Sequence, residues 1–501
     1  MKVESRNPWW WIPTLYFAEG IPYVMVMSVS VIMYKKLGIS NTDIAFFTSL
    51  LYFPWFLKFA WGPFVDMFKT KRFWTVTMQG LIALTLFGVA ASLPQSYFWH
   101  MTLIIFSLMA FSSATHDIAA DGYYMLSLDQ KTQAAFVGVR STFYRIATIV
   151  GSGLLVVIAG QLENKIGNQA AWAVVFVVMG VLFSIMFIYH KFILPYPKED
   201  KGTLQGKKLS ASQIILMAGG FALVAVVFFL LFEVISKVLS FANVPSMWQT
   251  IISTISLVII AVIMFRTIVA ARIEKFEASV NKNDVFTPFI EFLKAFVVFM
   301  KKKDIWTVLG FLLFFRFAEA QLVKLVQPFL LDPRDKGGLG LTTSEVGIVY
   351  GTIGVIALTA GGLIGGYVIS KKGLKWWLWP MVIIMHTPDL AFVYLSHFMP
   401  TNIFVISTAV AFEQFGYGFG FTAYMMYMIM ISQGEYKTAH YAICTGIMAL
   451  GMMIPGMFSG ALQETIGYSH FFLWVVLSTI PGFIVTALVK IDPEFGIKAE
   501  K

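Results

Sequence analysis

The chain has 501 residues, of which 58% are hydrophobic and only 13% are charged, and its formal net charge is +10. A water-soluble fold could not hide so many apolar side chains, so the composition excludes an ordinary soluble protein and predicts a polytopic membrane protein. Most Lys and Arg residues lie in short breaks between apolar runs, where they orient helices in a bilayer, so no nucleic-acid partner is expected. The single cysteine, Cys444, excludes an internal disulfide.

About fourteen apolar runs have the roughly 20 helical residues that a bilayer core requires, which predicts an all-α membrane protein. The expected spans are Trp9–Tyr34, Ile44–Phe64, Phe73–Leu93, Phe98–Leu126, Ala135–Ala159, Ala170–Lys191, Ser212–Val238, Pro245–Val269, Ile305–Leu331, Ser344–Ile369, Trp376–Ser396, Asn402–Ser432, Ala439–Leu462 and His470–Val489. The first run contains Glu19 and lacks a small-residue cleavage site, so we expect a retained helix and not a signal peptide. Glu274–Met300 mixes charges with Phe residues and fits either a membrane-surface helix or a plain linker.

The distribution of basic residues predicts the orientation of these spans. With the N-terminus in the cytoplasm, the more basic loops all face the same side, and the opposite loops hold fewer cations. These cytoplasmic cations are Lys69, Lys71, Arg72, the Lys198–Lys208 stretch, Lys301–Lys303, Lys371, Lys372 and Lys375. We therefore expect a multi-pass protein with both termini in the cytoplasm.

The chain resembles itself at a nearly constant distance. GQLENKIG at Gly160–Gly167 aligns with GALQETIG at Gly460–Gly467, and FAEG at Phe17–Gly20 aligns with FAEA at Phe317–Ala320, both at an offset of 300. GISNTDI from residue 38 and GLTTSEV from residue 340 match at an offset of 302. This repeat predicts two six-helix halves, with an extra helix pair inserted between them. The expected domains are residues 1–192, a linker of residues 193–304 with two extra helices and an amphipathic segment, and residues 305–501.

A loop motif agrees with this architecture. GPFVDMFKTKR, between the second and third spans, contains Gly62, Asp66, Lys71 and Arg72. A chain with two six-helix halves around a central cavity and with such a motif resembles the major facilitator superfamily. An Asp at a helix end can pair with a neighbouring helix terminus or Arg in one conformation and release it in another, so these four residues are candidates for conformational gating. Loop charges that only set orientation are the alternative.

Ionisable side chains inside the predicted spans are the main candidates for function, because each costs about 2.5–3.5 kcal/mol to insert. Burial and a movable Arg partner together let a carboxyl group load and release a proton, so we assign proton coupling to the carboxyl groups. These are Glu19, Asp117, Asp121 and Glu319. The candidates for binding an anionic solute are Lys58, Tyr124, Tyr144, Arg145, Arg316, Glu413 and Tyr417.

Two other interpretations of these residues stay open. Arg145 with Asp117 or Asp121, and Arg316 with Glu319, could be neutralised pairs that only hold helices together. A membrane-embedded transferase would need a clustered catalytic group, but the sequence contains neither a metal-ligand spacing nor a nucleophile with an obvious partner. No Walker-type loop is present either. We therefore expect no enzyme activity, catalytic residue, metal or cofactor.

Longer stretches carry a more specific similarity. They are KFAWGPFVD from Lys58, SSATHDIAADGYYMLSL from Ser112, YR at Tyr144, FFRFAEA from Phe314 and FEQFGYGFGFTAYM from Phe412. In these stretches the chain resembles the AmpG muropeptide permeases, a branch of the superfamily grouped with the acetyl-coenzyme A transporters. The resemblance implies a proton-driven importer of peptidoglycan fragments, GlcNAc-anhydroMurNAc muropeptides or related amino sugars, in a bacterial inner membrane. We expect a monomer.

Two departures from the AmpG pattern leave the substrate open. Glu19 stands where AmpG proteins typically lack an acid, and Glu319 stands where they carry Asp. A transporter of a smaller amino sugar or of an acyl-coenzyme A would share most of these residues. A sensor that binds the same solute without moving it is an alternative from another class.

Overall fold

The computed structural model describes residues 6–201, residues 287–497 and a few single positions between them. The predicted inserted pair, residues 212–269, therefore lies outside the described residues, and so does the first part of the Glu274–Met300 segment. The last part of that segment forms helix α13 (Thr287–Met300). The chain divides into two compact units, one of Met1–Val65, Thr70–Lys201 and Trp306–Lys501 and one of Asp66–Lys69 and Gly202–Ile305. Each unit is described by itself.

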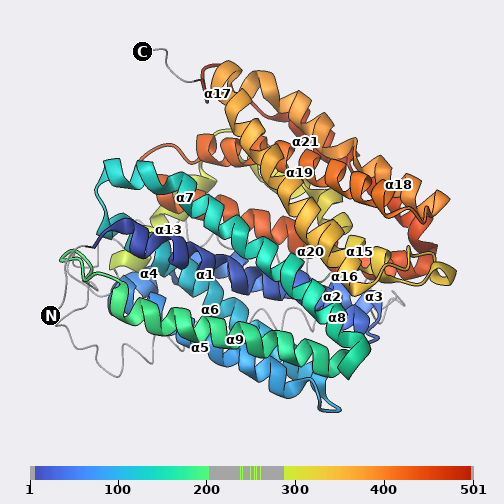
Figure 1. Ribbon diagram of the computed structural model, residues 1–501. Helices are drawn as coiled ribbons and strands as arrows, with labels where there is room; N and C mark the ends of the chain where they lie inside the picture. The colour runs from blue at the N-terminus through green and yellow to red at the C-terminus, as the bar shows by residue number, and fades with distance from the viewer. Residues whose placement is uncertain are drawn as a thin grey trace. The chain divides into compact units, whose positions relative to one another are not determined.

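The N-terminal part of the main unit is a bundle of long helices, which we call the N-terminal bundle. Its elements are the 3-10 turn η1 (Pro8–Trp10), α1 (Ile12–Val24), the π-helical η2 (Met25–Val29), α2 (Ser30–Lys36), α3 (Asn41–Leu50), α4 (Phe53–Met67), α5 (Lys71–Ser92), α6 (Phe98–Ser127), α7 (Gln130–Thr148), the π-helical η3 (Ile149–Leu155), α8 (Val156–Ile166) and α9 (Asn168–Ile193). Helix α5 packs against both α6 and α9, and α1 packs against α7 and α6 (Figure 1).

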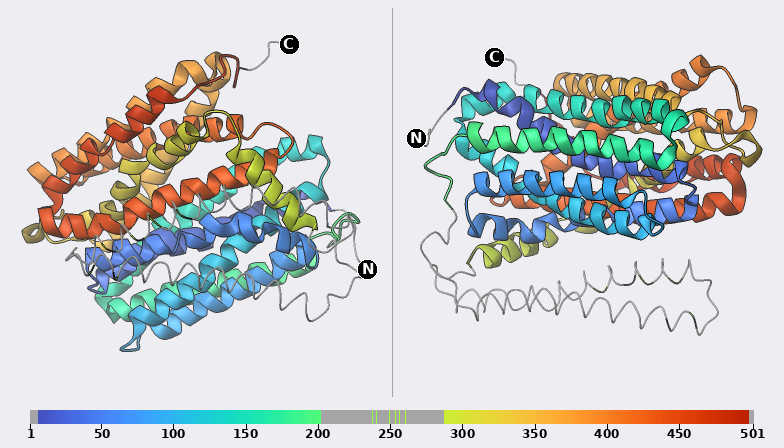
Figure 2. Two further views of the ribbon diagram at one scale, coloured as in Figure 1. Left: turned by 180° about the vertical axis from the view of Figure 1, so that it is seen from behind. Right: turned by 60° about the horizontal axis from the view of Figure 1, so that its bottom comes forward.

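The C-terminal part forms a second set of helices, the C-terminal bundle. Its elements are α14 (Ile305–Phe314), α15 (Phe317–Leu331), the 3-10 turn η5 (Arg334–Lys336), α16 (Thr343–Ile348), the π-helical η6 (Val349–Gly354), α17 (Val355–His386), α18 (Asp389–Phe398), α19 (Ile403–Ile431), α20 (Lys437–Leu477) and α21 (Ile480–Leu488). Helices α17 and α19 run side by side in all views (Figures 1 and 2), and α15 packs against α20. A Cβ on Gly418 would meet the backbone of Leu358, so the small residues of α19 allow this close approach.

The all-helical class is confirmed, because the described residues form helices joined by short turns. Seven helical stretches among these residues are long and apolar enough to cross a membrane. Two of these stretches, Thr343–Phe398 and Lys437–Leu488, each contain two predicted spans, because the chain turns at a glycine while the helical hydrogen bonding continues on both sides. Gly373 and Gly467 have φ values of +78° and +74°, which L side chains rarely adopt. The total of about fourteen spans stays a prediction.

Side-chain caps fix where several helices begin. The Thr342 hydroxyl accepts the Glu345 backbone N–H while the Glu345 carboxylate accepts the Thr342 backbone N–H, a complete capping box for α16. Ser40 caps α3 and Asp129 caps α7 in the same way through their side-chain oxygens. The first four N–H groups of a helix have no intrahelical partner, so these caps fix where the loops between consecutive helices end.

At one end of the molecule the two bundles are packed together. Here α3 contacts α20, α8 contacts α16, and α2 contacts α15, as their grouped labels in Figure 1 also show. The π-helical segments η3 and η6 cross where Gly153 and Gly351 meet, and a Cβ on Gly351 would lie 2.5 Å from the Gly153 nitrogen. We call this end, which includes Asn41, Glu163 and Asp332, the closed end.

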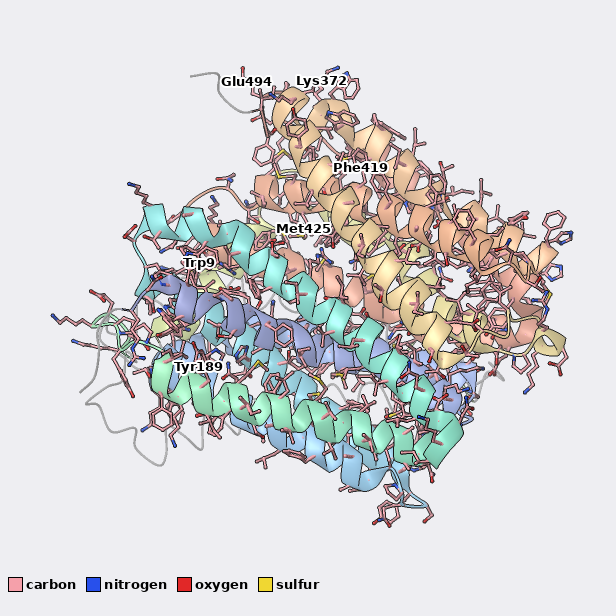
Figure 3. The ribbon with its side chains drawn as sticks, viewed as in Figure 1. Trp9, Tyr189, Lys372, Phe419, Met425 and Glu494 are labelled. Atoms are coloured by element: carbon pink, nitrogen blue, oxygen red, sulfur yellow. The ribbon has the colours of Figure 1, made fainter. Side chains whose placement is uncertain are left out.

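The opposite end holds the first and last residues that the structure describes (Figure 1). The Tyr189 hydroxyl donates to the Trp10 carbonyl at 2.5 Å, which ties the start of the chain to α9, and Figure 3 places Tyr189 and Trp9 in this region. In the C-terminal bundle, the Leu374 N–H donates to the Phe495 carbonyl at 3.0 Å. Lys372 and Glu494 accordingly lie together in Figure 3.

Candidate functional site

Four helices of the N-terminal bundle bring together most of the predicted charges. Electrostatic interactions link Glu19 on α1 with Asp117 and Asp121 on α6, with Lys58 on α4 and with Arg140 on α7. Asp117 and Asp121 are four residues apart, so one face of α6 carries both carboxylates. Three of the four predicted proton-coupling residues therefore form a single cluster.

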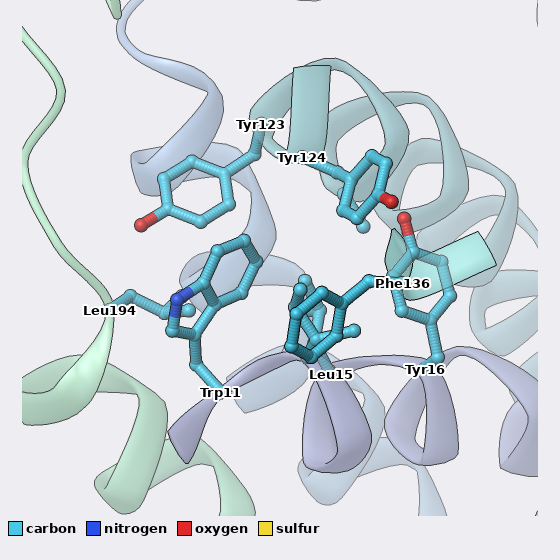
Figure 4. Close-up of a cluster of buried hydrophobic side chains, with 9 residues drawn as sticks. Trp11, Leu15, Tyr16, Tyr123, Tyr124, Phe136 and Leu194 are labelled. Carbon is cyan, nitrogen blue, oxygen red and sulfur yellow. The ribbon is translucent and has the colours of Figure 1, made fainter. Parts of the chain in front are cut away.

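Arg140 is the ion-pair partner of Asp121. Its guanidinium contacts Asp121 Oδ1 directly, and the Tyr16 hydroxyl donates to the same oxygen at 3.2 Å. The guanidinium carbon lies 4.2 Å from the centroid of the Tyr16 ring and 4.4 Å from that of Tyr124, so both rings make cation–π contacts with it. Figure 4 shows the hydroxyl ends of these two rings approaching each other.

This arrangement corrects the alternative that Arg145 pairs with Asp117 or Asp121. Among the described residues, Arg145 has no ion pair with either carboxylate; it interacts electrostatically with Tyr144 and with Tyr417 of the other bundle. Asp121 is instead paired with Arg140, which lies in the same predicted span as Arg145 but was not among the named site residues. The predicted ligand Tyr144 interacts with Asp117 and Glu19 as well, so it lies beside the N-terminal cluster.

The C-terminal bundle holds a second cluster at a break in a helix. Helix α14 ends at Phe314 and α15 begins at Phe317, so Arg316 lies in the break and Glu319 in the first turn of α15. A carboxylate is favourable at this position because the helix start carries partial positive charge. Glu319 Oε1 and Arg316 Nε have no hydrogen-bond partner, and both side chains are buried. The suggested ion pair between these two residues is absent.

Arg316 is held instead by aromatic side chains. Its Nη2 donates to the Tyr417 hydroxyl at 2.5 Å, and the guanidinium lies over the rings of Tyr417 and Phe421. Tyr417, a predicted substrate ligand, therefore contacts the predicted cation directly. Among the described residues, no carboxylate forms an ion pair with Arg316.

Glu413 lies deeper in the same bundle. Gln414 Nε2 donates to Glu413 Oε2 at 2.9 Å, and electrostatic interactions join Glu413 to Glu319 and to Tyr350 of the π-helical segment η6. Because Glu413 is only 1% exposed, it is held by protein groups and not by bulk water. Tyr350 is a member of the cluster that the sequence did not suggest.

Tyrosines connect the two clusters. Tyr52, at the break between α3 and α4, interacts electrostatically with Tyr23 of α1 and with Arg316 and Tyr417 of the other bundle. Lys324 donates to Thr48 Oγ1 at 2.9 Å across the bundles, and its ammonium lies 5.2 Å from the Tyr52 ring centroid. Nothing in the sequence indicated that Tyr52 would occupy this position, since the second span was expected to be one continuous helix.

The predicted gating motif is only partly described. The Asp66 side chain lies outside the described part of the chain, and Gly62 has open space around it. The backbone N–H groups of Lys71 and Arg72, at the start of α5, donate to the two carboxylate oxygens of Asp200 at 2.6 and 2.9 Å. Burial raises the pKa of Asp200, which these backbone donors and the nearby cations oppose.

Arg72 fastens the start of α5 to the end of α9. Its guanidinium donates to the carbonyls of Leu194 and Lys191 and lies 3.8 Å from the centroid of the Tyr196 ring. In this conformation the motif residue Arg72 therefore holds the beginning of the linker in place.

Polar side chains join the bundles at the closed end. Asp332 accepts hydrogen bonds from Lys35 Nζ and from the Tyr468 hydroxyl, both at 2.6 Å. Asn41 donates to Gln463 at 2.7 Å, and at the other side of this end the Thr343 hydroxyl donates to Glu163 at 2.6 Å.

The two sides of the closed end are related by the sequence repeat. Asn41 and Thr343 are separated by 302 residues, and Glu163 and Gln463 by 300 residues, the same offsets as in the sequence comparison. Gly160 and Gly460 extend the equivalence, because a Cβ on either glycine would meet the backbone at the start of a helix of the opposite bundle. The closure is therefore duplicated, and on the Asp332 side an ion pair with Lys35 also joins the two bundles, whereas the ion pair of Glu163 with Lys36 stays within the N-terminal bundle.

Comparisons with known proteins agree with this architecture. Residues 14–283 match the family model described as Major Facilitator Superfamily. A Rickettsia conorii protein named as transporter AmpG 4 is 24% identical over 485 residues, covering 94% of both chains. The anhydromuropeptide permease of Escherichia coli K12 is 24% identical over 39% of each chain.

Solved transporters share the fold at low identity. The nucleoside transporter NupG superposes with a TM-score of 0.57 at 13% identity, covering 96% of this chain and 98% of its own. A POT family transporter crystallised with 5-aminolevulinic acid gives a TM-score of 0.63 at 11% identity, covering 95% of both chains. The matched proteins are transporters and permeases, not enzymes. The chain is a multi-pass membrane transporter related to the AmpG proteins, and it belongs to the Major Facilitator Superfamily.

Proposed function

We propose that the protein is a proton-coupled symporter that imports anionic amino sugars or muropeptides by alternating access. The observation that carries this proposal is the pair of ionisable clusters, one half-buried in the N-terminal bundle and one buried in the C-terminal bundle, connected by tyrosines of both bundles. Buried charges are expensive in a membrane protein, so their concentration at the bundle interface supports a solute pathway over a purely structural role.

The roles follow from the chemistry of each group. Glu19, Asp117, Asp121 and Glu319 carry the proton, because carboxylates near movable cations can change protonation state. Arginine presents a planar fork of donors that matches a carboxylate, so Arg145 and Arg316 bind the anionic part of the substrate. Lys58, Tyr124, Tyr144, Glu413 and Tyr417 complete the binding surface.

The closed end supplies the conformational part of the proposal. The more basic loops are placed in the cytoplasm together with both termini, so the closed end faces the outside of a bacterial inner membrane. Import then requires that the contacts of Asp332 and Glu163 break to admit the solute and form again before release. Gly62, Asp66, Lys71 and Arg72 act on the opposite side, and the monomer is the transporting unit.

The AmpG relatives support peptidoglycan fragments as the substrate class. The alternative cargo is another anion, either an acyl-coenzyme A or a smaller amino sugar. Uptake into proteoliposomes distinguishes them when GlcNAc-anhydroMurNAc, free amino sugars and acetyl-coenzyme A are compared with and without a pH gradient. Uptake of every compound at the same rate in both conditions would reject proton symport, and binding without uptake would favour a sensor.

Two substitutions test the assigned roles. Glu319→Gln should abolish accumulation driven by the pH gradient while substrate exchange continues, because the amide cannot carry the proton. Glu345→Gln is the matched control, since Gln still fills the capping box of an exposed helix start. Arg145→Ala should reduce transport of anionic substrates, and full transport by this variant would remove Arg145 from the site.

A further inference from the structure

We propose that Arg140 binds the carboxylate of the substrate, and that Asp121 occupies the position of that carboxylate while the site is empty. This inference rests on the function proposed above and adds to it a ligand and a coupling step. The proposed function assigns anion binding in this bundle to Arg145, and the geometry adds Arg140 to that role.

The first argument is the contact itself. Asp121 already places a carboxylate against the Arg140 guanidinium, and the Tyr16 hydroxyl donates to the same carboxylate oxygen at 3.2 Å. These donors therefore form an anion position of the right size, because a carboxylate fits there in the structure. A second carboxylate, from a solute, would find the same guanidinium and phenol donors.

The second argument is the rigidity of the frame around Arg140. The rings of Tyr16 and Tyr124 meet edge to face, 5.9 Å apart, and both are about 2% exposed. They belong to a hydrophobic cluster with Trp11, Leu15 and Tyr123 (Figure 4). A guanidinium flanked by two fixed rings keeps its orientation when its partner changes, which lowers the entropic cost of binding.

The third argument is accessibility. The Asp121 side chain is 49% exposed and that of Arg140 is 27% exposed, whereas Arg316 is 6% exposed. A solute can therefore reach the Arg140 pair without rearrangement of the buried C-terminal cluster. Because its side chain is half exposed, Asp121 also has room to rotate away from the guanidinium.

The coupling step conserves charge and atoms. A substrate carboxylate displaces Asp121 from Arg140, and the released Asp121 carboxylate binds one proton to become a neutral acid. One anion and one proton enter together, and the site keeps its net charge. On release, the proton leaves Asp121 and the Asp121–Arg140 pair forms again.

The neighbours of Asp121 favour protonation once Arg140 is withdrawn. Glu19 on α1 and Asp117 on α6 present further carboxylates, and Tyr441 of α20 interacts with Asp121 electrostatically. On α5, the Lys71 side chain packs beside Gly122, and Lys58 on α4 interacts electrostatically with Glu19 and Asp117. Without the guanidinium, an ionised Asp121 would lose its ion-pair partner while Glu19 and Asp117 remain nearby, so proton uptake removes one of three neighbouring negative charges.

The test compares two forms of one sugar in proteoliposomes. The probes are GlcNAc-anhydroMurNAc with a free lactyl carboxylate and the same disaccharide with that group converted to a carboxamide. For Arg140→Gln we expect a rise in KM of about 10- to 100-fold for the carboxylate and little change for the carboxamide. Arg140→Lys should recover part of the loss, because it restores the charge but not the planar fork.

Lys131→Gln is the matched control, since it removes a cation from an exposed position at the start of the same helix. This variant should behave like the wild-type protein with both sugars. For Asp121→Asn we expect exchange of the carboxylate substrate to continue, while accumulation driven by the pH gradient is lost.

The outcomes separate this inference from the proposed function. If the wild-type protein takes up neither sugar in response to a pH gradient, the symport proposal itself fails. If the wild-type protein shows gradient-driven uptake but Arg140→Gln still prefers the carboxylate to the same degree, only the role of Arg140 is overturned. Accumulation by Asp121→Asn equal to that of the wild-type protein would likewise overturn the coupling step.

Discussion

The crossing of η3 and η6 at the closed end makes Gly351 the most direct position at which to test alternating access. A Cβ at this position would lie 2.5 Å from the Gly153 nitrogen and closer still to the Ser152 carbonyl group. Unstrained contacts of a carbon atom are about 3.5 Å or longer, so relieving the contact with the Ser152 carbonyl in Gly351→Ala must move the two backbones apart by roughly 1.5 Å. The neighbouring atoms are backbone, which cannot rotate away.

The expected size of the effect follows from the cost of overpacking. Inserting a methyl group into a packed contact costs about 1–3 kcal/mol. Because the contact joins the two bundles, the cost falls on the closed conformation and is absent when this end opens. The equilibrium should therefore shift toward the open conformation by about 5- to 150-fold.

Spin labels at exposed positions in the two bundles at this end measure the shift. Lys165→Cys and Lys336→Cys provide the labels, with Cys444→Ser removing the native thiol. Pulsed dipolar spectroscopy should show a larger share of long distances in Gly351→Ala. Gly366→Ala is the control, since a Cβ there meets nothing within 4 Å. Identical distance distributions in both variants would refute the close crossing as a determinant of closure.

Two further predictions concern polar contacts. Asp332→Asn should shift the equilibrium between the closed and open conformations toward the open one by about 3 kcal/mol, because it leaves Lys35 without its carboxylate. The same spin-label distances measure this shift. Lys36→Gln, in a longer and more exposed pair at 3.6 Å, should shift the same equilibrium by less than about 1 kcal/mol. Asp200→Ala should lower the stability of the purified protein by about 1 kcal/mol through loss of the caps on α5, seen as a lower melting temperature at neutral pH. Burial raises the pKa of Asp200, so the folded protein binds this proton more tightly than the unfolded chain does. The contribution of Asp200 to stability should therefore fall as pH rises from about 4, the ordinary Asp value, and Asp200→Ala should lack this slope.

The helical class and the repeat were predictable because they depend on local composition. Apolar runs of sufficient length specify helices in lipid, since the backbone must satisfy its own hydrogen bonds there. The repeated glycines at 167 and 467 mark the same turn in both halves, and both have positive φ values, +82° and +74°. Only glycine adopts this geometry readily, so the sequence signal had a direct backbone cause.

The partner of Asp121 could not be predicted in the same way. Arg140 and Arg145 lie on one helix, but five residues rotate the side chain by about 140° around the axis. Only one of them can face α6, and the packing of α7 against α1 decides which one does. A sequence shows that both arginines belong to the same predicted span, but it does not specify the rotation of α7.

The breaks at Tyr52 and Arg316 escaped prediction for a related reason. Both positions lie inside runs apolar enough to be predicted as single spans, and no proline or glycine adjoins Arg316. Pro54 follows Tyr52 closely, but membrane helices tolerate proline, so it did not specify a break. Tertiary contacts explain the breaks, since Arg316 interacts electrostatically with Tyr52 across the bundles and donates a hydrogen bond to Tyr417. Irregular backbone is tolerated at membrane depth where neighbouring protein groups satisfy it, so such breaks tend to coincide with solute sites.

The repeat also shows that the two halves are not chemically equivalent. An offset of 300 relates Tyr16 to Arg316 and Glu19 to Glu319. In the N-terminal bundle the arginine beside the tyrosine comes from α7 and has Asp121 as its partner, whereas among the described residues Arg316 has no carboxylate partner. An anion between the bundles would therefore have to displace Asp121 on one side but meet an unneutralised guanidinium on the other. This difference makes the N-terminal arginine suited to coupling binding to protonation, and the C-terminal arginine suited to attraction alone.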